Sequence, residues 1–252
     1  MRRLLNLYAL LAFAFLHLPL LALAFFSFNE SRFTVWQGLS LRWFVAAFQD
    51  GQLAEATWNS LLIAGVATVL STVIGTLCSY ALWKRSSPRV SGMLYLSLVT
   101  PEIVMGVALL AFFQWLFRYV GVQSGMASVI LAHTMFCIAY VVVVMTARLR
   151  TMDVQLEEAA LDLGATEWHV FTQVTLPQLY PAIAASALLA FTISFDDYVI
   201  TSMVAGVDSE TLPMVIYALA RRGANPVVNA ISTLIVIGLG VLILLSERLQ
   251  NR

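Results

Sequence analysis

Long apolar stretches separated by short polar segments dominate this chain. Each stretch is at least as long as the roughly 20 residues that a helix needs to cross the hydrocarbon layer of a membrane. We expect six membrane-spanning helices, over Leu4–Phe28, Thr57–Trp83, Met93–Phe117, Met126–Ala147, Ala182–Ala205 and Val227–Ser246. A transmembrane β-barrel would instead show segments of about ten residues that alternate between apolar and polar. The pattern therefore predicts an all-α polytopic membrane protein.

The composition supports the same class. Hydrophobic residues make up 60% of the chain and charged residues 11%, whereas a soluble domain has roughly 45–50% apolar and about 25% charged residues. The net charge is zero and gives no reason to expect a nucleic-acid partner. Cys78 and Cys137 both lie inside apolar stretches and outside any metal-ligand spacing. We therefore expect two reduced cysteines, no disulfide and no metal site.

The distribution of Lys and Arg indicates the orientation of the chain, because basic residues are retained on the cytoplasmic side. Six spans place both termini on one side. With the termini inside, nine basic residues are cytoplasmic: Arg2, Arg3, Lys84, Arg85, Arg89, Arg148, Arg150, Arg248 and Arg252. Five face outward: Arg32, Arg42, Arg118, Arg221 and Arg222. We therefore expect a multi-pass membrane protein with both termini in the cytoplasm.

The first apolar stretch has a second interpretation, as a cleaved secretory signal. Arg2 and Arg3 precede it, and the small residues Ala22 and Ala24 lie near its end. The apolar core of such a signal has only about 7 to 15 residues. Because this stretch is longer, we expect it to be retained as a membrane span.

Three connecting segments are long enough to have structure of their own. We expect 29–56 and 206–226 outside the membrane and 148–180 in the cytoplasm. Aromatic residues in the first of them indicate an amphipathic piece at the membrane interface; they are Phe33, Trp36, Trp43, Phe44 and Phe48. We find no internal repeat of the kind that many secondary transporters contain. We therefore treat residues 1–252 as one transmembrane domain.

The cytoplasmic segment carries the most specific pattern. From Asp153 it reads DVQLEEAALDLGATEWHVFTQVTLPQLYPAI, which predicts a helix, a turn at Gly164 and a second helix that Thr166 caps and that ends before Pro177. An apolar stripe at helical spacing consists of Leu156, Ala159, Ala160 and Leu163. We expect three acidic residues elsewhere on the surface: Glu157, Asp162 and Glu167. Such a stripe predicts a partner protein.

The residues Glu158-Ala159-Ala160, Gly164, Val174 and Leu176-Pro177 match the pattern E-A-A-x(3)-G-x(9)-I-x-L-P, with Val174 in place of isoleucine. The segment resembles the signature loop of binding-protein-dependent ABC importer permeases. The resemblance implies a MetI-like type I importer permease fold. It also implies that this loop is a coupling helix that docks on a separate cytoplasmic ATPase. By position, the docking role falls to Glu158, Ala159, Ala160 and Gly164.

The chain itself has no means of binding ATP through a P-loop. That motif needs G-x-x-x-x-G-K-[ST], and Lys84 is the single lysine of the chain, flanked by Trp83 and Arg85. We therefore expect a transport subunit with no catalytic residue and no cofactor, with ATP and Mg²⁺ bound by the partner ATPase.

Three carboxylates fall inside expected spans: Glu102 in the third, and the adjacent Asp196 and Asp197 in the fifth. Carboxylates at such depth are costly unless they face a cavity or a partner. Neighbouring helix positions are about 100° apart, so Asp196 and Asp197 cannot point to the same place. We take these three residues and Tyr198 as candidates for a translocation pathway, with helix-stabilising hydrogen bonds as the alternative. We expect His17, His133 and Gln114 to be interhelical hydrogen-bond partners.

The sequence FTISFDDYVITSMVAG and the outer run from Ser27 to Trp43 resemble the second permease subunit of spermidine/putrescine importers. This resemblance covers nearly the whole chain. It implies a pairing with a homologous permease subunit, two ATPase copies and a periplasmic substrate-binding protein. It also implies that the chain lies in the lipid of the bacterial inner membrane. It implies a polyamine substrate, and permeases of this type also carry other amine-containing or organic solutes.

Two other classes of membrane protein would explain the sequence less well. An ion-coupled secondary transporter would use them as a proton relay but would leave the E-A-A loop unexplained. An intramembrane enzyme would need paired catalytic residues, and adjacent positions on one helix are badly placed to share a proton.

Overall fold

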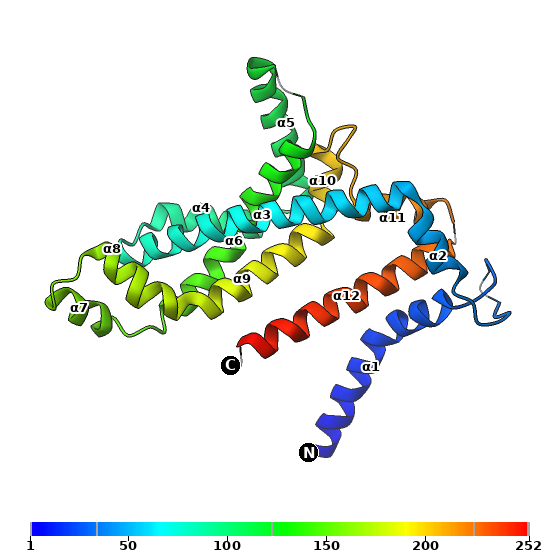
Figure 1. Cartoon of the computed structure of the whole chain (residues 1–252), viewed down its shortest axis with the longest axis horizontal. Coiled ribbons are helices and arrows are strands. Elements are labelled where there is room, and N and C mark those ends of the chain that lie inside the picture. Colours follow the sequence, from blue (N-terminus) through cyan, green and yellow to red (C-terminus); the bar gives the residue numbers. More distant parts are fainter. Residues whose placement is uncertain (1, 34, 122, 224, 251–252) are drawn as a thin grey trace. The chain divides into compact units, whose positions relative to one another are not determined.

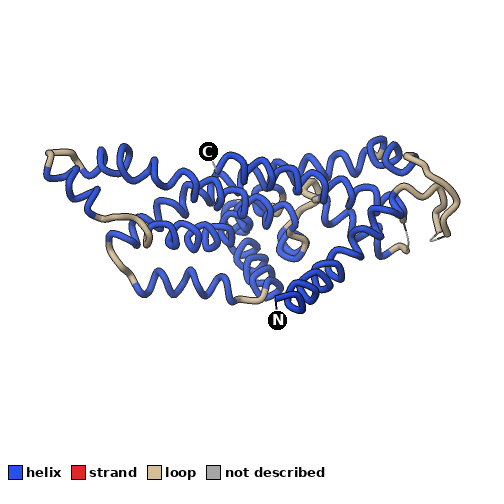
Figure 2. Tube along the Cα trace, turned by 90° about the horizontal axis from the view of Figure 1, so that it is seen from below, coloured by secondary structure: helices blue, strands red, loops and turns tan. Residues whose placement is uncertain are grey.

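The computed structural model describes residues 2–33, 35–121, 123–223 and 225–250, with side chains for 4–33, 35–119, 121, 123–223, 225–238 and 240–241. The described chain is built from helices joined by short loops (Figures 1 and 2). The helices are α1 (Arg2–Ser27), α2 (Arg42–Gln49), α3 (Gly51–Lys84), α4 (Pro88–Val99), α5 (Glu102–Val120), α6 (Met126–Leu149), α7 (Gln155–Asp162), α8 (Glu167–Val170), the π-helical turn η1 (Phe171–Thr175), α9 (Leu176–Asp196), α10 (Val199–Val204), α11 (Leu212–Arg221) and α12 (Pro226–Gln250).

Within the described residues, five helical stretches are long and apolar enough to cross a membrane: Leu4–Ser27, Gly51–Lys84, Glu102–Tyr119, Met126–Leu149 and Glu167–Asp196. The sixth expected span falls on α12, whose described apolar part runs over Pro226–Gly238. In the remainder of that span, side chains are described at 240–241 alone. The all-α membrane fold that the sequence predicts is confirmed.

The third expected span is wrong as a single helix. It divides into α4 and α5, because Pro101 interrupts it and Thr100 before it is extended, at φ −66° and ψ 128°. Proline has no amide hydrogen to donate and disfavours helical backbone in the residue before it. As a result, Glu102 lies in the first turn of α5 and not in the middle of a span.

The fifth expected span is also interrupted. It ends as α9 at Asp196, and Asp197 is extended at φ −67° and ψ 126° before α10 begins at Val199. Its start differs as well. Helical backbone runs without a break from Glu167 through η1 into α9, so the second cytoplasmic helix does not end before Pro177. A π turn ahead of Pro177 gives room where the proline ring would clash with the carbonyl four residues earlier.

One compact unit consists of Met1–Ala56 and Met214–Leu242. Its loop after α1 closes around Asn29, which is 1% exposed. The Asn29 side chain donates to the carbonyls of Phe33 and Val35 at 3.1 and 2.9 Å, and Trp43 Nε1 donates to the Asn29 carbonyl at 2.8 Å. Helix α2 buries Trp43 and Ala47 and exposes Phe48. The amphipathic piece expected in this loop is therefore a short helix.

The second compact unit consists of Thr57–Pro213 and Ile243–Arg252. Helix α6 is its centre and packs against α9, α4 and α10, while α10 packs against α5 (Figure 1). Met145 and Leu149 of α6 and Leu179 of α9 are completely buried in its apolar core. Gly75 of α3 lies so close to α6 that a Cβ atom there would be 2.6 Å from Val141 Cγ1. A small residue such as Gly75 that lets two helices approach closely is typical of helix packing in membranes.

Candidate functional site

The two helix interruptions line the same cavity, which has a volume of about 510 Å³. Its walls come from the end of α4, the start of α5, the middle of α6, the end of α9 and the start of α10. The lining residues are Ser97, Leu98, Thr100, Pro101, Glu102, Met105, Phe136, Tyr140, Ile193, Asp196, Asp197, Tyr198, Val199 and Ile200. All four candidate pathway residues of the sequence analysis are among them. Interrupted helices in a membrane are tolerated where the freed backbone lines a cavity, and transporter binding sites are commonly built from such helices.

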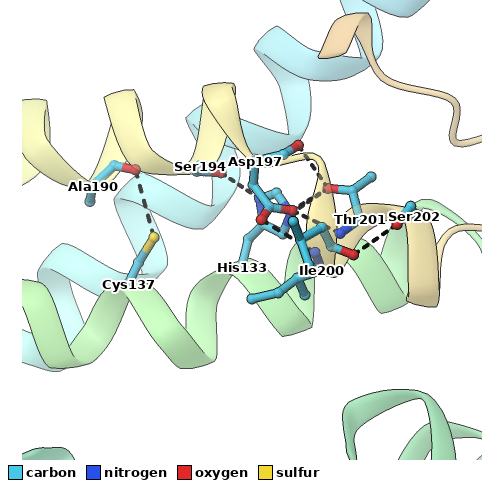
Figure 3. Close-up of polar contacts among 9 residues, drawn as sticks. His133, Cys137, Ala190, Ser194, Asp197, Ile200, Thr201 and Ser202 are labelled. Atoms are coloured by element: carbon cyan, nitrogen blue, oxygen red, sulfur yellow. Dashed lines mark hydrogen bonds and ion pairs between the residues drawn. The ribbon is translucent and has the colours of Figure 1, made fainter. Parts of the chain in front are cut away.

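Both carboxylate oxygens of Asp197 accept hydrogen bonds (Figure 3). Its Oδ2 accepts from the amide and the hydroxyl of Thr201 at 2.7 and 2.8 Å, and its Oδ1 accepts from the amide of Ile200 at 3.3 Å. His133 Nε2 lies 3.4 Å from Oδ2. The side chain is 6% exposed. Asp197 thus binds free amides in the first turn of α10, as capping carboxylates do.

His133 connects three helices at this point. It is 1% exposed on α6, its Nδ1 lies 2.7 Å from Ser194 Oγ of α9, and its Nε2 lies 2.9 Å from Thr201 Oγ1 of α10 (Figure 3). The expected interhelical role of His133 is confirmed. His17 instead contacts the carbonyl of Phe13 in its own helix at 2.8 Å, and Gln114 is exposed.

Asp196 and Glu102 differ from Asp197. Both side chains are exposed, both line the cavity, and within the described part of the chain neither carboxylate has a hydrogen-bond partner. Glu102 lies in the first turn of α5, where the positive end of the helix dipole stabilises a carboxylate. The two acids are therefore free to meet a cation that enters the cavity, which also presents Phe136, Tyr140 and Tyr198.

The segment 148–180 has the helix, turn and helix that its sequence predicts. Gly164 follows α7 at φ +85°, a left-handed conformation that glycine adopts without strain. The amide of Ala165 then donates to the Ala160 carbonyl at 3.1 Å. Thr166 Oγ1 accepts from the His169 amide at 3.3 Å and caps α8. Leu156 and Leu163 of the apolar stripe are 49% and 90% exposed, so this face of α7 is open to a partner.

Glu157 contradicts the sequence analysis. It was expected on the surface, but it is 2% exposed. Its carboxylate accepts from Lys84 Nζ, at the end of α3, and from Thr175 Oγ1, at the end of η1. Helical periodicity placed it off the apolar stripe of α7, but that face turns inward against α3 and η1. The single lysine of the chain, Lys84, lies at the end of an expected span, but no local pattern in the sequence links it to Glu157.

Comparison with known proteins places the chain in a family. The family model described as the binding-protein-dependent transport system inner membrane component matches residues 71–252. The putrescine transport system permease protein PotI of Escherichia coli K12 is 42% identical over 239 residues, covering 92% of this chain and 85% of that protein. The spermidine/putrescine transport system permease protein PotC of Haemophilus influenzae is 38% identical over 251 residues, covering 98% and 96%.

Solved structures share the fold at lower identity. A bacterial ABC transporter involved in the import of the acidic polysaccharide alginate superposes with a TM-score of 0.76 at 17% identity, covering 100% of this chain and 96% of that one. The MetNI methionine ABC transporter superposes with a TM-score of 0.65 at 20% identity, covering 79% and 93%. The protein therefore belongs to the inner membrane components of binding-protein-dependent transport systems, the permease subunits of ABC importers.

Proposed function

We propose that this permease subunit imports a polyamine, of the putrescine or spermidine class, across the inner membrane. The observation that carries the substrate class is the presence of two unpaired carboxylates, Glu102 and Asp196, on one cavity between interrupted helices. The similarity to PotI and PotC, whose names specify putrescine and spermidine, supports the same substrate.

The chemistry of the cavity suits an organic cation. An ammonium group that leaves water needs opposite charge, because the interaction between unit charges grows as the dielectric constant falls. Glu102 and Asp196 supply that charge from α5 and α9. Tyr140, Tyr198 and Phe136 add aromatic rings, whose faces attract ammonium groups. Asp197, Tyr198 and Glu102 thus have different proposed roles: Asp197 holds the helix interruption, and the other two line the path.

The other subunits of the proposed importer are inferred from the E-A-A pattern in the segment 148–180. In our proposal Glu158, Ala159, Ala160 and Gly164 dock on the ATPase, and the complex contains a homologous permease subunit, two ATPase copies and a periplasmic substrate-binding protein. The exposure of Leu156 and Leu163 supports a docking surface here. Both termini then lie in the cytoplasm, with 29–56 and 206–226 outside, in a single transmembrane domain over residues 1–252.

The decisive experiment is ATP-dependent uptake into vesicles that contain the whole complex and its binding protein. Labelled putrescine and spermidine are compared with an anionic solute of similar size. We expect uptake of at least one polyamine and none of the anion. Absence of polyamine uptake in a complex that still contains the ATPase would overturn the substrate and leave an importer of another amine-containing or organic solute.

A further inference from the structure

Glu157 is an exception on an otherwise exposed helix. On the eight residues of α7, Glu157 is the single buried side chain, while its neighbours Leu156 and Leu161 are 49% and 42% exposed. A carboxylate loses much of its hydration when it is buried, and this cost is offset only when the charge is paired and its oxygens are hydrogen-bonded. The partners of Glu157 therefore explain how α7 is held.

Both oxygens of the carboxylate are occupied, each by a different element. Oε2 pairs with Lys84 Nζ, whose side chain is 41% exposed. Oε1 accepts from Thr175 Oγ1, which is completely buried. Beside this contact, the rings of Tyr80 in α3 and Phe171 in η1 lie 4.7 Å apart. One side chain of α7 thus joins the end of α3 to the π turn ahead of α9.

The helix that begins at this turn also reaches the cavity. Helical backbone is continuous from Glu167 through η1 to Asp196, about 45 Å at 1.5 Å per residue. Figure 1 shows α7 at one end of this helical rod and α10 near its other end. A displacement of η1 is therefore transmitted along α9 toward Asp196.

We propose that Glu157 is a positioning residue that fastens the coupling helix α7 to η1 and α3, so that a movement of α7 displaces α9. This inference rests on the proposed docking of α7 on an ATPase. Without the contact to Thr175, α7 would still dock, but the segment around Gly164 would absorb part of its movement. The expected signature is loss of coupling between ATP hydrolysis and uptake, with the complex intact.

The sharpest test uses two threonines of the same π turn. Thr175→Val removes the contact to Glu157 and leaves the pair with Lys84. Thr172→Val is the matched control, because the Thr172 hydroxyl donates to the Trp168 carbonyl within the same helix at 2.8 Å. In the full complex we would measure ATPase copurification, ATP hydrolysis stimulated by the binding protein, and solute taken up per ATP hydrolysed.

We expect Thr175→Val to lower uptake per ATP by about fivefold or more, the lower range of energetic coupling between distinct sites, with normal copurification. Thr172→Val should match the wild type. Glu157→Gln should resemble Thr175→Val, and Lys84→Arg, which keeps the pair, should retain coupling. Uptake per ATP at the wild-type level in both Thr175→Val and Glu157→Gln would overturn the inference.

A further variant distinguishes a failure of this inference from a failure of the docking proposal. Glu158→Lys changes the exposed neighbour of Glu157 and should reduce copurification of the ATPase. If Glu158→Lys copurifies normally and remains active, the docking assignment fails. If docking depends on Glu158 but Thr175→Val and Glu157→Gln stay fully coupled, the positioning role of Glu157 alone fails.

Discussion

At the residue scale, two adjacent carboxylates have opposite environments. Asp197 is 6% exposed on its side chain and bound by Thr201, Ile200 and His133. Asp196 is exposed and lines the cavity. The difference arises because α9 ends between them. The Asp197 side chain therefore accepts hydrogen bonds from the first turn of α10. Of these two carboxylates, Asp196 is the one that accepts no hydrogen bond within the described part of the chain.

We predict that Asp196→Asn lowers polyamine uptake at least about tenfold, the effect of ~1.4 kcal/mol, while assembly is unchanged. The cation would lose one of the two charges that replace its hydration. Asp208→Asn is the matched control, since Asp208 is exposed in the loop after α10 and lies off the cavity. Labelled uptake at equal amounts of assembled complex measures the effect, and equal uptake in the two variants would contradict a pathway role for Asp196.

Asp197→Asn should act mainly on stability. It removes charge-assisted hydrogen bonds to the start of α10 and leaves His133 without its carboxylate, a loss of about 1.5–3 kcal/mol. Thermal unfolding in detergent should therefore occur at a lower temperature than for Asp196→Asn. The reverse order would show that Asp197 does not hold the junction of α9 and α10.

At the element scale, particular prolines and glycines decide where helices stop or widen into a π turn. Pro101 separates α4 from α5, Pro177 follows the π turn, and Gly164 ends α7 in the left-handed region. Each residue acts through its backbone: proline by its missing amide hydrogen and glycine by its missing Cβ. These interruptions put Glu102 on the cavity and leave α7 exposed.

We predict that Gly164→Ala reduces uptake more than Gly164→Asn. A Cβ at φ +85° costs about 1–2 kcal/mol, whereas asparagine enters the left-handed region more readily than alanine. No atom lies within 4 Å of the added Cβ, so crowding within the described chain does not contribute. Uptake and ATPase copurification test this. Equal activity of the two variants would indicate that the conformation of the turn is not what the loop requires.

At the scale of the whole molecule, one continuous helix connects the segment that contains α7 to the cavity. Because Glu167 and Asp196 are the ends of that helix, an importer could transmit a movement at one end along α9 to the cavity at the other end. This arrangement requires that the segment containing α7 and the loop after α10 lie on opposite sides of the membrane.

Cysteine labelling tests that orientation. We predict that Val207→Cys, at a position that is 98% exposed, reacts with a membrane-impermeant maleimide in intact spheroplasts. Gln173→Cys, also at an exposed position, should react only after the membrane is opened. The native Cys137 is buried and the native Cys78 is half-buried, so labelling of the unsubstituted chain is subtracted as background. Labelling in the reverse pattern would place the termini outside the cytoplasm.

The sequence alone determined the class of protein and the signature pattern of the segment 148–180. Apolar stretches of membrane length leave few alternatives to spanning helices, and the E-A-A pattern with Gly164 depends on local backbone requirements that nearby residues express. The sequence also contained Pro101, whose effect on the third span follows from local chemistry, although hydropathy alone predicted one helix there.

Only the tertiary structure decided which polar residues meet. His133 and Asp197 are far apart in the chain, as are Lys84 and Glu157, yet each pair is in contact. Periodicity gives the direction of a side chain relative to its own helix but not the element that covers it. For this reason Glu157 was expected at the surface, and Asp196 could not be distinguished from Asp197 until the packing of α6, α9 and α10 was known.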